Sequence, residues 1–292
     1  MITIGTGRFK AVIDQQGAEL KSLIDTHNGR EYLWSGDPAW WNGTAPILFP
    51  VIGGLHGGAY RFKGKEYRLP SHGFARQSRF RLIDQTPDDA QFDLMAQDKL
   101  KAHYPFSFHL LVSFHMEYSG ISVRYEVRNI GSSRMYFSIG SHPAFRLPFA
   151  GGPLEHYYVE FAVPERDERY LFLDGCMSHD TEPVYTNSRH INLSRNMFDR
   201  GPVILRDVAS RAVTIRKSRS MHAVTVHFDT PHLAIWSKPK GAPFLCIEPW
   251  HGLPDPVGFT GSIEDKPGIT ALDFRDSFTS SYRIEITDHD TL

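Results

Sequence analysis

The sequence predicts an all-β protein, a large antiparallel β-sandwich, and three observations lead to this prediction. Apolar and polar residues alternate with a period of two over most of the chain, as in strands that bury one face. The 24 glycines and 19 prolines fall mostly between these alternating runs, where they favour turns. Helical patterns are scarce, so the strand–helix alternation typical of parallel sheets is missing. Folds of this class can reach 292 residues as one domain, and we expect residues 1–292 to form a single domain.

In chain order, residues 98–103, just before Tyr104-Pro105, are the candidate for a helix of one or two turns. Apolar residues then recur at every second position from Leu110 to Tyr118, and again from Ile121 to Val127. The Ser119-Gly120 turn between the two runs is typical of an antiparallel hairpin. The same alternation predicts strands over 213–216, 223–228 and 282–286.

A short apolar run from Phe244 to Ile247 predicts a strand that Pro249 ends, because proline cannot donate to a β-ladder. Glu248 would then be the last residue before the chain leaves the sheet, held on rigid backbone and facing a cleft. Trp250 follows, and the flat face of tryptophan is a common floor for a sugar ring. This arrangement suits proton transfer by a positioned glutamate. A carboxylate bonded to loop amides is the structural alternative.

Two other apolar runs are interrupted by a histidine beside glycine or proline, His72 in 69–76 and His142 in 139–145. One such histidine is more often structural than catalytic, but three interrupted runs in one chain predict a shared cleft. A carboxylate with a pKa near ~4.3 and an imidazole with a pKa near ~6.5 can serve as base and acid at neutral pH. One of each across a small substrate suits the opening of a sugar hemiacetal ring, which needs no cofactor.

Composition and motifs argue against several other functions. A net charge of −1 does not suit nucleic-acid binding, and no apolar run is long enough to span a bilayer. The N-terminus lacks a signal-peptide pattern, and two cysteines, Cys176 and Cys246, are too few for a disulfide scaffold, so we expect a cytoplasmic protein. The 15 histidines show no metal-binding spacing, and we expect no metal. Motifs for a nucleophilic serine or a phosphate loop do not occur.

The three interrupted runs resemble those of the aldose 1-epimerase (galactose mutarotase) family, and most closely its bacterial mutarotase-like branch. The residues that carry the resemblance are His72-Gly73-Phe74-Ala75-Arg76, Ser141-His142-Pro143-Ala144-Phe145 and Cys246-Ile247-Glu248-Pro249-Trp250. Shorter matches follow in family order over nearly the whole chain, at 32–37, 46–50, 104–106 and 235–239. The family fold is a large antiparallel β-sandwich, the galactose mutarotase-like supersandwich, in agreement with the alternation.

The resemblance implies an enzyme, an isomerase that interconverts the α and β anomers of a free aldose without metal or cofactor. Glu248 would be the general base at the anomeric hydroxyl, and His142 the general acid at the ring oxygen. His72 would bond the substrate near the same atoms. Arg76 would bond sugar hydroxyls; a salt bridge from Arg76 to a loop carboxylate is the alternative.

Two positions depart from the family pattern. Gly54 stands where relatives carry an arginine, and Gly201 where they carry a substrate-orienting aspartate. Asp199 would share a strand face with that position and is the candidate replacement for substrate binding. These departures leave open a non-catalytic sugar-binding protein on the same fold. A hexose-6-phosphate epimerase would need a basic clamp, and a glycoside hydrolase usually needs a second carboxylate, for which Asp255 is the nearest candidate.

Overall fold

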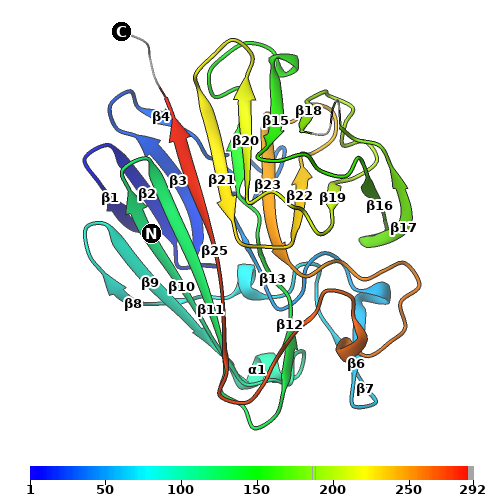
Figure 1. The fold of residues 1–292 in the computed structure, drawn as a ribbon. Coiled ribbons are helices and arrows are strands. Elements are labelled where there is room, and N and C mark those ends of the chain that lie inside the picture. The colour runs from blue at the N-terminus through cyan, green and yellow to red at the C-terminus, as the bar shows by residue number, and fades with distance from the viewer. Residues whose placement is uncertain (186, 188, 289–292) are drawn as a thin grey trace.

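The computed structural model describes residues 1–185, 187 and 189–288, and most of its regular elements are β-strands (Figure 1). A nine-stranded sheet contains, in spatial order, β18 (His190–Asn192), β15 (Tyr157–Phe161), β20 (Ala212–Lys217), β21 (Ala223–Phe228), β25 (Ser277–Thr287), β11 (Gly120–Asn129), β10 (Phe108–Glu117), β9 (Asp89–Met95) and β8 (Arg81–Gln85). An eight-stranded sheet contains β17 (Cys176–Glu182), β16 (Arg169–Leu173), β19 (Val203–Leu205), β22 (His232–Trp236), β23 (Phe244–His251), β13 (Ile139–Ser141) and β5 (Ile47–Leu48), with β14 (Ala144–Arg146) also paired to β23.

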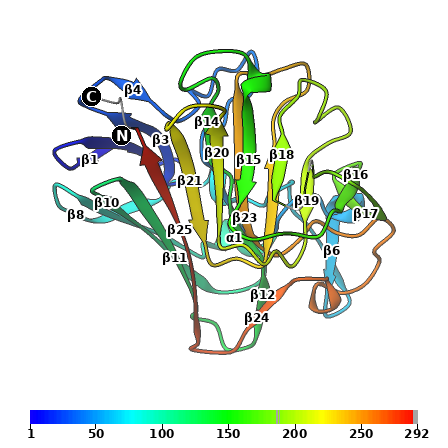
Figure 2. The ribbon, with the colours of Figure 1, turned by 45° about the horizontal axis from the view of Figure 1, so that its top comes forward.

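Three smaller sheets complete the fold. They are β1 (Ile2–Gly5), β2 (Phe9–Asp14), β3 (Glu19–Asp25) and β4 (Arg30–Glu31); β6 (Ala59–Phe62) with β7 (Lys65–Arg68); and β12 (Met135–Phe137) with β24 (Thr270–Leu272). The first of these lies beside the β8–β11 end of the nine-stranded sheet (Figures 1 and 2). Helices are short: α1 (Asp98–Lys101), as predicted, and the 3₁₀ turns His56–Gly58, Ala75–Gln77, Leu154–His156 and Ile263–Asp265.

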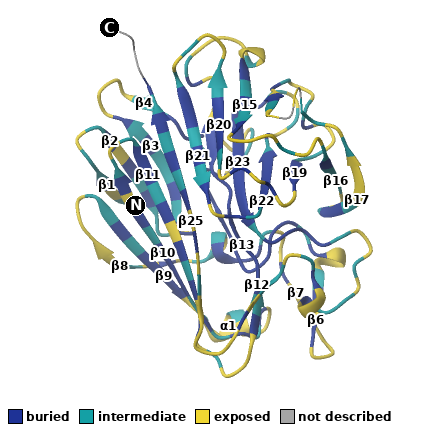
Figure 3. Cartoon of the chain, in the orientation of Figure 1, coloured by how far each residue is buried: buried dark blue, intermediate teal, exposed yellow. Residues whose placement is uncertain are grey.

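Every pairing between these strands is antiparallel, which confirms the predicted fold class. Buried residues run along the strands, and exposed residues concentrate in the connections (Figure 3). The largest cluster of buried apolar side chains draws on the four-, eight- and nine-stranded sheets. Such a shared core agrees with one domain over 1–292, which stays a prediction. Among the helices of the described residues, none has the length and apolar character needed to cross a membrane.

The predicted hairpin is present as β10 and β11, with one correction. Glu117 pairs with Gly120, so the turn is Tyr118-Ser119 and Gly120 begins β11. Tyr118 is therefore exposed in the turn instead of lying on the buried face. A Cβ on Gly120 would lie 2.0 Å from the carbonyl oxygen of Ile284 on β25, so this close backbone approach requires glycine.

The prediction that Pro249 ends its strand is wrong, because β23 continues through Pro249 to His251. The Ile247 N–H faces the β13–β14 side, where it donates to the carbonyl of Pro143 at 3.2 Å. Residues two apart face the same way, so the Pro249 nitrogen also faces that side, where the ladder is interrupted between β13 and β14. Pro249 therefore faces the end of β13, where the ladder is interrupted. Glu248 lies inside β23 and is not its last residue.

Candidate functional site

The two faces of β23 have different roles in the fold. Leu245 and Ile247 point into the core shared by the sheets, so the alternate residues Cys246, Glu248 and Trp250 point to the opposite, outer face. The β23 register pairs Ile139 with His251 and Ala144 with Cys246. Continued through the interruption, this register places His142 opposite Glu248.

A cavity of about 300 Å³ lies on this outer face, at the lower end of the ~300–1,000 Å³ range of small-molecule sites. Its lining brings together four of the five sequence-predicted site residues, namely Glu248, His142, His72 and Arg76. The rest of the lining is Trp41, Gly53, Ser71, Phe172, Gly175, Pro202, Trp236 and Trp250. The three interrupted runs therefore do converge on one cavity, and Trp250 forms part of its wall.

Glu248 and His142 contact each other in the lining of the cavity. The Nε2 atom of His142 lies 3.3 Å from Oε2 of Glu248, and both side chains are almost fully buried. Burial raises the pKa of Glu248 well above its usual value, while Arg76 and the nearby Trp250 indole act in the opposite direction. Burial, followed by the charges of His72 and Arg76, lowers the pKa of His142 well below its usual value. The reference pKa values assumed from the sequence therefore do not apply to either group.

His72 is fixed in one tautomer by the backbone. The Gly53 N–H donates to Nδ1 of His72 at 3.1 Å, which leaves the proton of the neutral ring on Nε2. Burial, and secondarily the charge of Arg76, lowers the pKa of His72 to about 3, so the ring is neutral at physiological pH. Its backbone has a φ of 65°, an unusual value for a non-glycine residue that is held by hydrogen bonds to Gly53 and Phe49. The His72 ring is therefore held in place by the backbone, with its Nε2–H available as a hydrogen-bond donor.

Arg76 carries the single positive charge among the described residues that line the cavity. Its guanidinium makes no ion pair or hydrogen bond with any residue that the structure describes, so the salt-bridge alternative is not observed. Burial lowers the pKa of Arg76, and the negative charges of Glu19 and Glu248 oppose that shift. Because a guanidinium stays protonated in proteins, Arg76 retains donors that a ligand can use.

Aromatic rings that sequence reasoning did not assign to the site form much of the wall. Trp41 stacks on His142, with ring centroids 4.8 Å apart, and Trp236 meets the same imidazole edge-on at 5.7 Å. Phe172, on β16, also lines the cavity. The adjacent pair Trp40-Trp41 in a segment rich in glycine and proline was the available signal for Trp41. Nothing in the alternation singled out Phe172.

The structure does not bring Asp199 to the cavity. The expectation assumed that a strand runs through residues 197–205, but β19 begins only at Val203 and the preceding residues form turns. Strand alternation therefore does not apply, and Asp199 is exposed. Gly201 has a φ of 95°, and a Cβ there would lie 3.1 Å from Cβ of Phe172. The Phe172 side chain thus crowds the space in front of Gly201.

Gly54 is similarly confined. A Cβ at this position would lie 2.5 Å from the carbonyl oxygen of Gly175, which accepts the Gly54 N–H at 2.8 Å. The turn before β17 therefore occupies the space that the arginine expected here from the family pattern would need to leave the backbone.

We expect Gly54→Ala to lower the melting temperature, because overpacking a tight site typically costs ~1–3 kcal/mol. Gly54→Arg should be at least as harmful, and it should not improve sugar affinity. Gly7→Ala is the matched control, because its Cβ would meet nothing within 4 Å. Equal melting temperatures for Gly54→Ala and wild type, measured by scanning calorimetry, would contradict the close approach.

Two groups of potential metal ligands occur among the described residues. His142, Cys246 and Glu248 are buried, and each can place one ligand atom within 4.8 Å of the others. Asp88, Asp89 and His115 form a more exposed group. The sequence-based expectation of no metal rested on spacing along the chain, which does not reveal groups assembled across strands.

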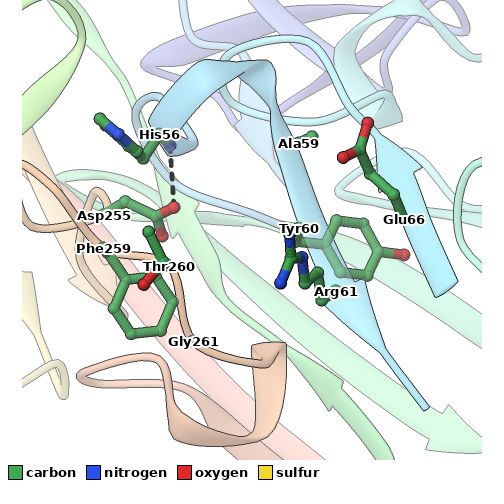
Figure 4. A pocket seen from close by; sticks show the side chains of 9 residues that line it. All are labelled: His56, Ala59, Tyr60, Arg61, Glu66, Asp255, Phe259, Thr260 and Gly261. Carbon is green, nitrogen blue, oxygen red and sulfur yellow. Dashed lines mark hydrogen bonds between the residues drawn. The ribbon is translucent and has the colours of Figure 1, made fainter. Parts of the chain in front are cut away.

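A second cavity of about 130 Å³ lies near the β6–β7 hairpin (Figure 4). The Asp255 carboxylate lines it and accepts the His56 N–H at 2.9 Å. The other oxygen of Asp255 pairs with Nζ of Lys266, and both side chains are almost completely buried. Both carboxylate oxygens of Asp255 therefore have partners outside the first cavity. Among the described residues that line the first cavity, Glu248 is the one carboxylate. This arrangement does not favour the two-carboxylate site of a glycoside hydrolase.

Comparison with known proteins agrees with this architecture. The model of the family described as aldose 1-epimerase matches residues 1–269. The chromosomal protein LacX of Lactococcus lactis subsp. lactis is 32% identical over 295 residues, covering 96% of both chains. A galactose mutarotase-like protein from Lactobacillus casei has a TM-score of 0.92 at 32% identity, over 98% of this chain and 99% of that one. A galactose mutarotase related enzyme from Lactobacillus acidophilus has a TM-score of 0.93 at 29% identity, and the match covers 100% of this chain and 99% of that one. The chain belongs to the aldose 1-epimerase family, and the resemblance carried by its three motifs is confirmed.

Proposed function

We propose that this protein is a cofactor-free mutarotase that interconverts the α and β anomers of a free aldose. The observation that carries the proposal is the contact of 3.3 Å between His142 Nε2 and Glu248 Oε2 in one buried cavity. The anomeric hydroxyl and the ring oxygen are bonded to the same carbon. A base and an acid that serve these two oxygens must therefore lie a few ångströms apart, as these two groups do.

In the proposed reaction, ionised Glu248 removes the proton of the anomeric hydroxyl, and the C1–O5 bond breaks as the C1 carbonyl forms. Protonated His142 gives its proton to O5, which becomes a hydroxyl. Rotation about C1–C2 presents the other face of the carbonyl, and the reverse proton transfers close the ring. The Nε2–H of His72 and the guanidinium of Arg76 would donate hydrogen bonds to sugar oxygens, and the aromatic wall would pack against the C–H faces of the ring.

The productive free enzyme in this scheme carries one proton, on His142, with Glu248 ionised. The raised pKa of Glu248 moves the acid limit of activity upward, and the lowered pKa of His142 moves the alkaline limit downward. We therefore expect the plot of kcat/KM against pH to be a narrow bell with a low maximum. Its two apparent pKa values describe the coupled pair of Glu248 and His142, and not either residue alone. Initial rates of anomer exchange, corrected for the spontaneous reaction at each pH, measure this profile. A broad plateau from acid to alkaline pH would contradict these roles.

Arg76→Lys is expected to raise KM more than it lowers kcat. Lysine retains the positive charge but loses the planar fork of donors, so bonds to sugar hydroxyls should weaken in the ground state and the transition state alike. Arg79→Lys is a control, because Arg79 is exposed, donates to the side chain of Gln15 and does not line the cavity. A fall in kcat at unchanged KM would instead place Arg76 in the chemical step.

The direct test is polarimetry or NMR of freshly dissolved α-glucose, α-galactose and a hexose 6-phosphate, with and without protein. Faster anomer exchange of a free aldose supports the proposal. Sugar binding without acceleration would favour the non-catalytic alternative suggested by the glycines at positions 54 and 201. Preference for the 6-phosphate would favour the sugar-phosphate variant, although Arg76 is the one cation among the described lining residues. The cytoplasmic location stays a prediction of the sequence.

A further inference from the structure

A third reactive group, which the proposed reaction does not use, lies beside two of the residues that line the cavity, His142 and Glu248. Cys246 precedes Glu248 by two residues on β23, so both side chains point to the same face. His142 comes from the interrupted strand opposite Glu248. A ligand atom from each of the three residues lies within 4.8 Å of the other two. A thiol, an imidazole and a carboxylate therefore meet at one buried point.

We propose that His142, Cys246 and Glu248 form a binding site for Zn²⁺ or a similar thiophilic divalent cation, which excludes the sugar and inhibits the enzyme. Inhibition rests on the proposed mutarotase function, whereas cation binding does not.

The spacing of the ligands suits zinc. Tetrahedral zinc with bonds of ~2.0–2.2 Å to nitrogen and oxygen holds two such ligands ~3.3–3.6 Å apart. The observed separation between His142 Nε2 and Glu248 Oε2 is 3.3 Å, at the lower end of that range. The Cys246 sulfur lies within 4.8 Å of both atoms. Tetrahedral zinc with a sulfur bond of ~2.3 Å requires ~3.5–3.7 Å, so the side chains must close by at most ~1.3 Å. The open side of the cavity supplies the fourth position, as in zinc sites that keep three protein ligands.

The chemistry of the ligands selects the cation. Thiolate and imidazole favour zinc and other soft or borderline metals over Mg²⁺ or Ca²⁺, which prefer oxygen ligands. The His142 ring is not locked by the backbone, because its Nδ1 atom has no hydrogen-bond partner, in contrast to His72. Its Nε2 lone pair can therefore turn to a metal. Binding releases the Cys246 thiol proton to solvent, so affinity should increase with pH.

The test is calorimetric titration of chelator-treated protein with Zn²⁺, followed by assays of anomer exchange in the presence of Zn²⁺. We expect one ion per chain in the wild type, and inhibition that is competitive with sugar and reversed by EDTA. Cys246→Ser should weaken binding at least ~100-fold, beyond the ~10–100-fold effect of losing an outer-shell partner. Cys176→Ser is the matched control, because Cys176 is also buried but does not belong to the ligand group of His142, Cys246 and Glu248, and this variant should bind zinc as the wild type does.

Cd²⁺ provides a second measurement that does not depend on the folding of a Cys246 variant. Its thiolate charge-transfer absorption should appear with wild type and Cys176→Ser alike. Absence of this absorption band would overturn the proposal. So would zinc binding that survives Cys246→Ser but disappears in His115→Ala, because that result would assign the ion to the more exposed group of Asp88, Asp89 and His115. Zinc binding at Cys246 without any mutarotase activity would instead count against the proposed function alone.

Discussion

Glu248→Gln is expected to reduce the rate of anomer exchange by ~10²–10⁴-fold, the usual contribution of a general base. The glutamine amide retains the shape of the buried carboxyl group but cannot take up a proton from the anomeric hydroxyl. Sugar binding should change little, because Glu248 is one of several polar groups that line the cavity. Binding can be followed by intrinsic fluorescence, since Trp41, Trp236 and Trp250 lie in the cavity wall.

His142→Asn should have an effect of similar size, because it removes the proton donor for the ring oxygen. Glu160→Gln is the matched control: Glu160 pairs with Arg216 and His190 on the nine-stranded sheet, away from the cavity. A Glu248→Gln enzyme with the wild-type rate would show that the base is assigned wrongly. Loss of sugar binding together with the rate would show that Glu248 positions the sugar as well.

Lys266→Met is expected to destabilise the protein by ~3–5 kcal/mol, because removing one partner of a buried ion pair leaves the other charge uncompensated. Lys266 and Asp255 are 1% and 3% exposed, so water cannot replace the lost ammonium group. The pair also supports the first cavity. The Asp255 N–H donates to Gly54, and its carbonyl accepts the Met177 N–H, so Asp255 ties together the segments that carry Gly53 and Gly175.

Urea denaturation measures the loss in the free energy of unfolding, and scanning calorimetry should show a fall in melting temperature on the order of 10 °C. The double variant Lys266→Met, Asp255→Asn should recover part of the loss, because the amide oxygen can still accept the His56 N–H without carrying a buried charge. Arg134→Met is the control, since the ion pair of Arg134 with Asp273 is exposed, and it should leave the melting temperature nearly unchanged. Equal stability of Lys266→Met and the wild type would show that the buried pair is dispensable.

The sequence by itself determined the fold class, because the alternation of buried and exposed side chains in a strand is a local property of period two. The runs now seen in β10, β11, β20, β21 and β25 could be read directly from it. Short motifs in family order also determined the family, and with it Glu248, His142, His72 and Arg76 as candidate residues. These predictions required no knowledge of which strands are neighbours.

The tertiary structure alone decided how those residues act together. The contact between His142 and Glu248 depends on pairing between strands about a hundred positions apart, and the same register brings Cys246 to them. Trp41 and Phe172 reach the cavity from distant segments, while Asp199 stays outside because its segment is not a strand. The pKa shifts of Glu248 and His142 arise from desolvation by surroundings that no local pattern specifies. Register, cavity walls and burial are non-local properties of the folded chain, which is why only the structure could provide them.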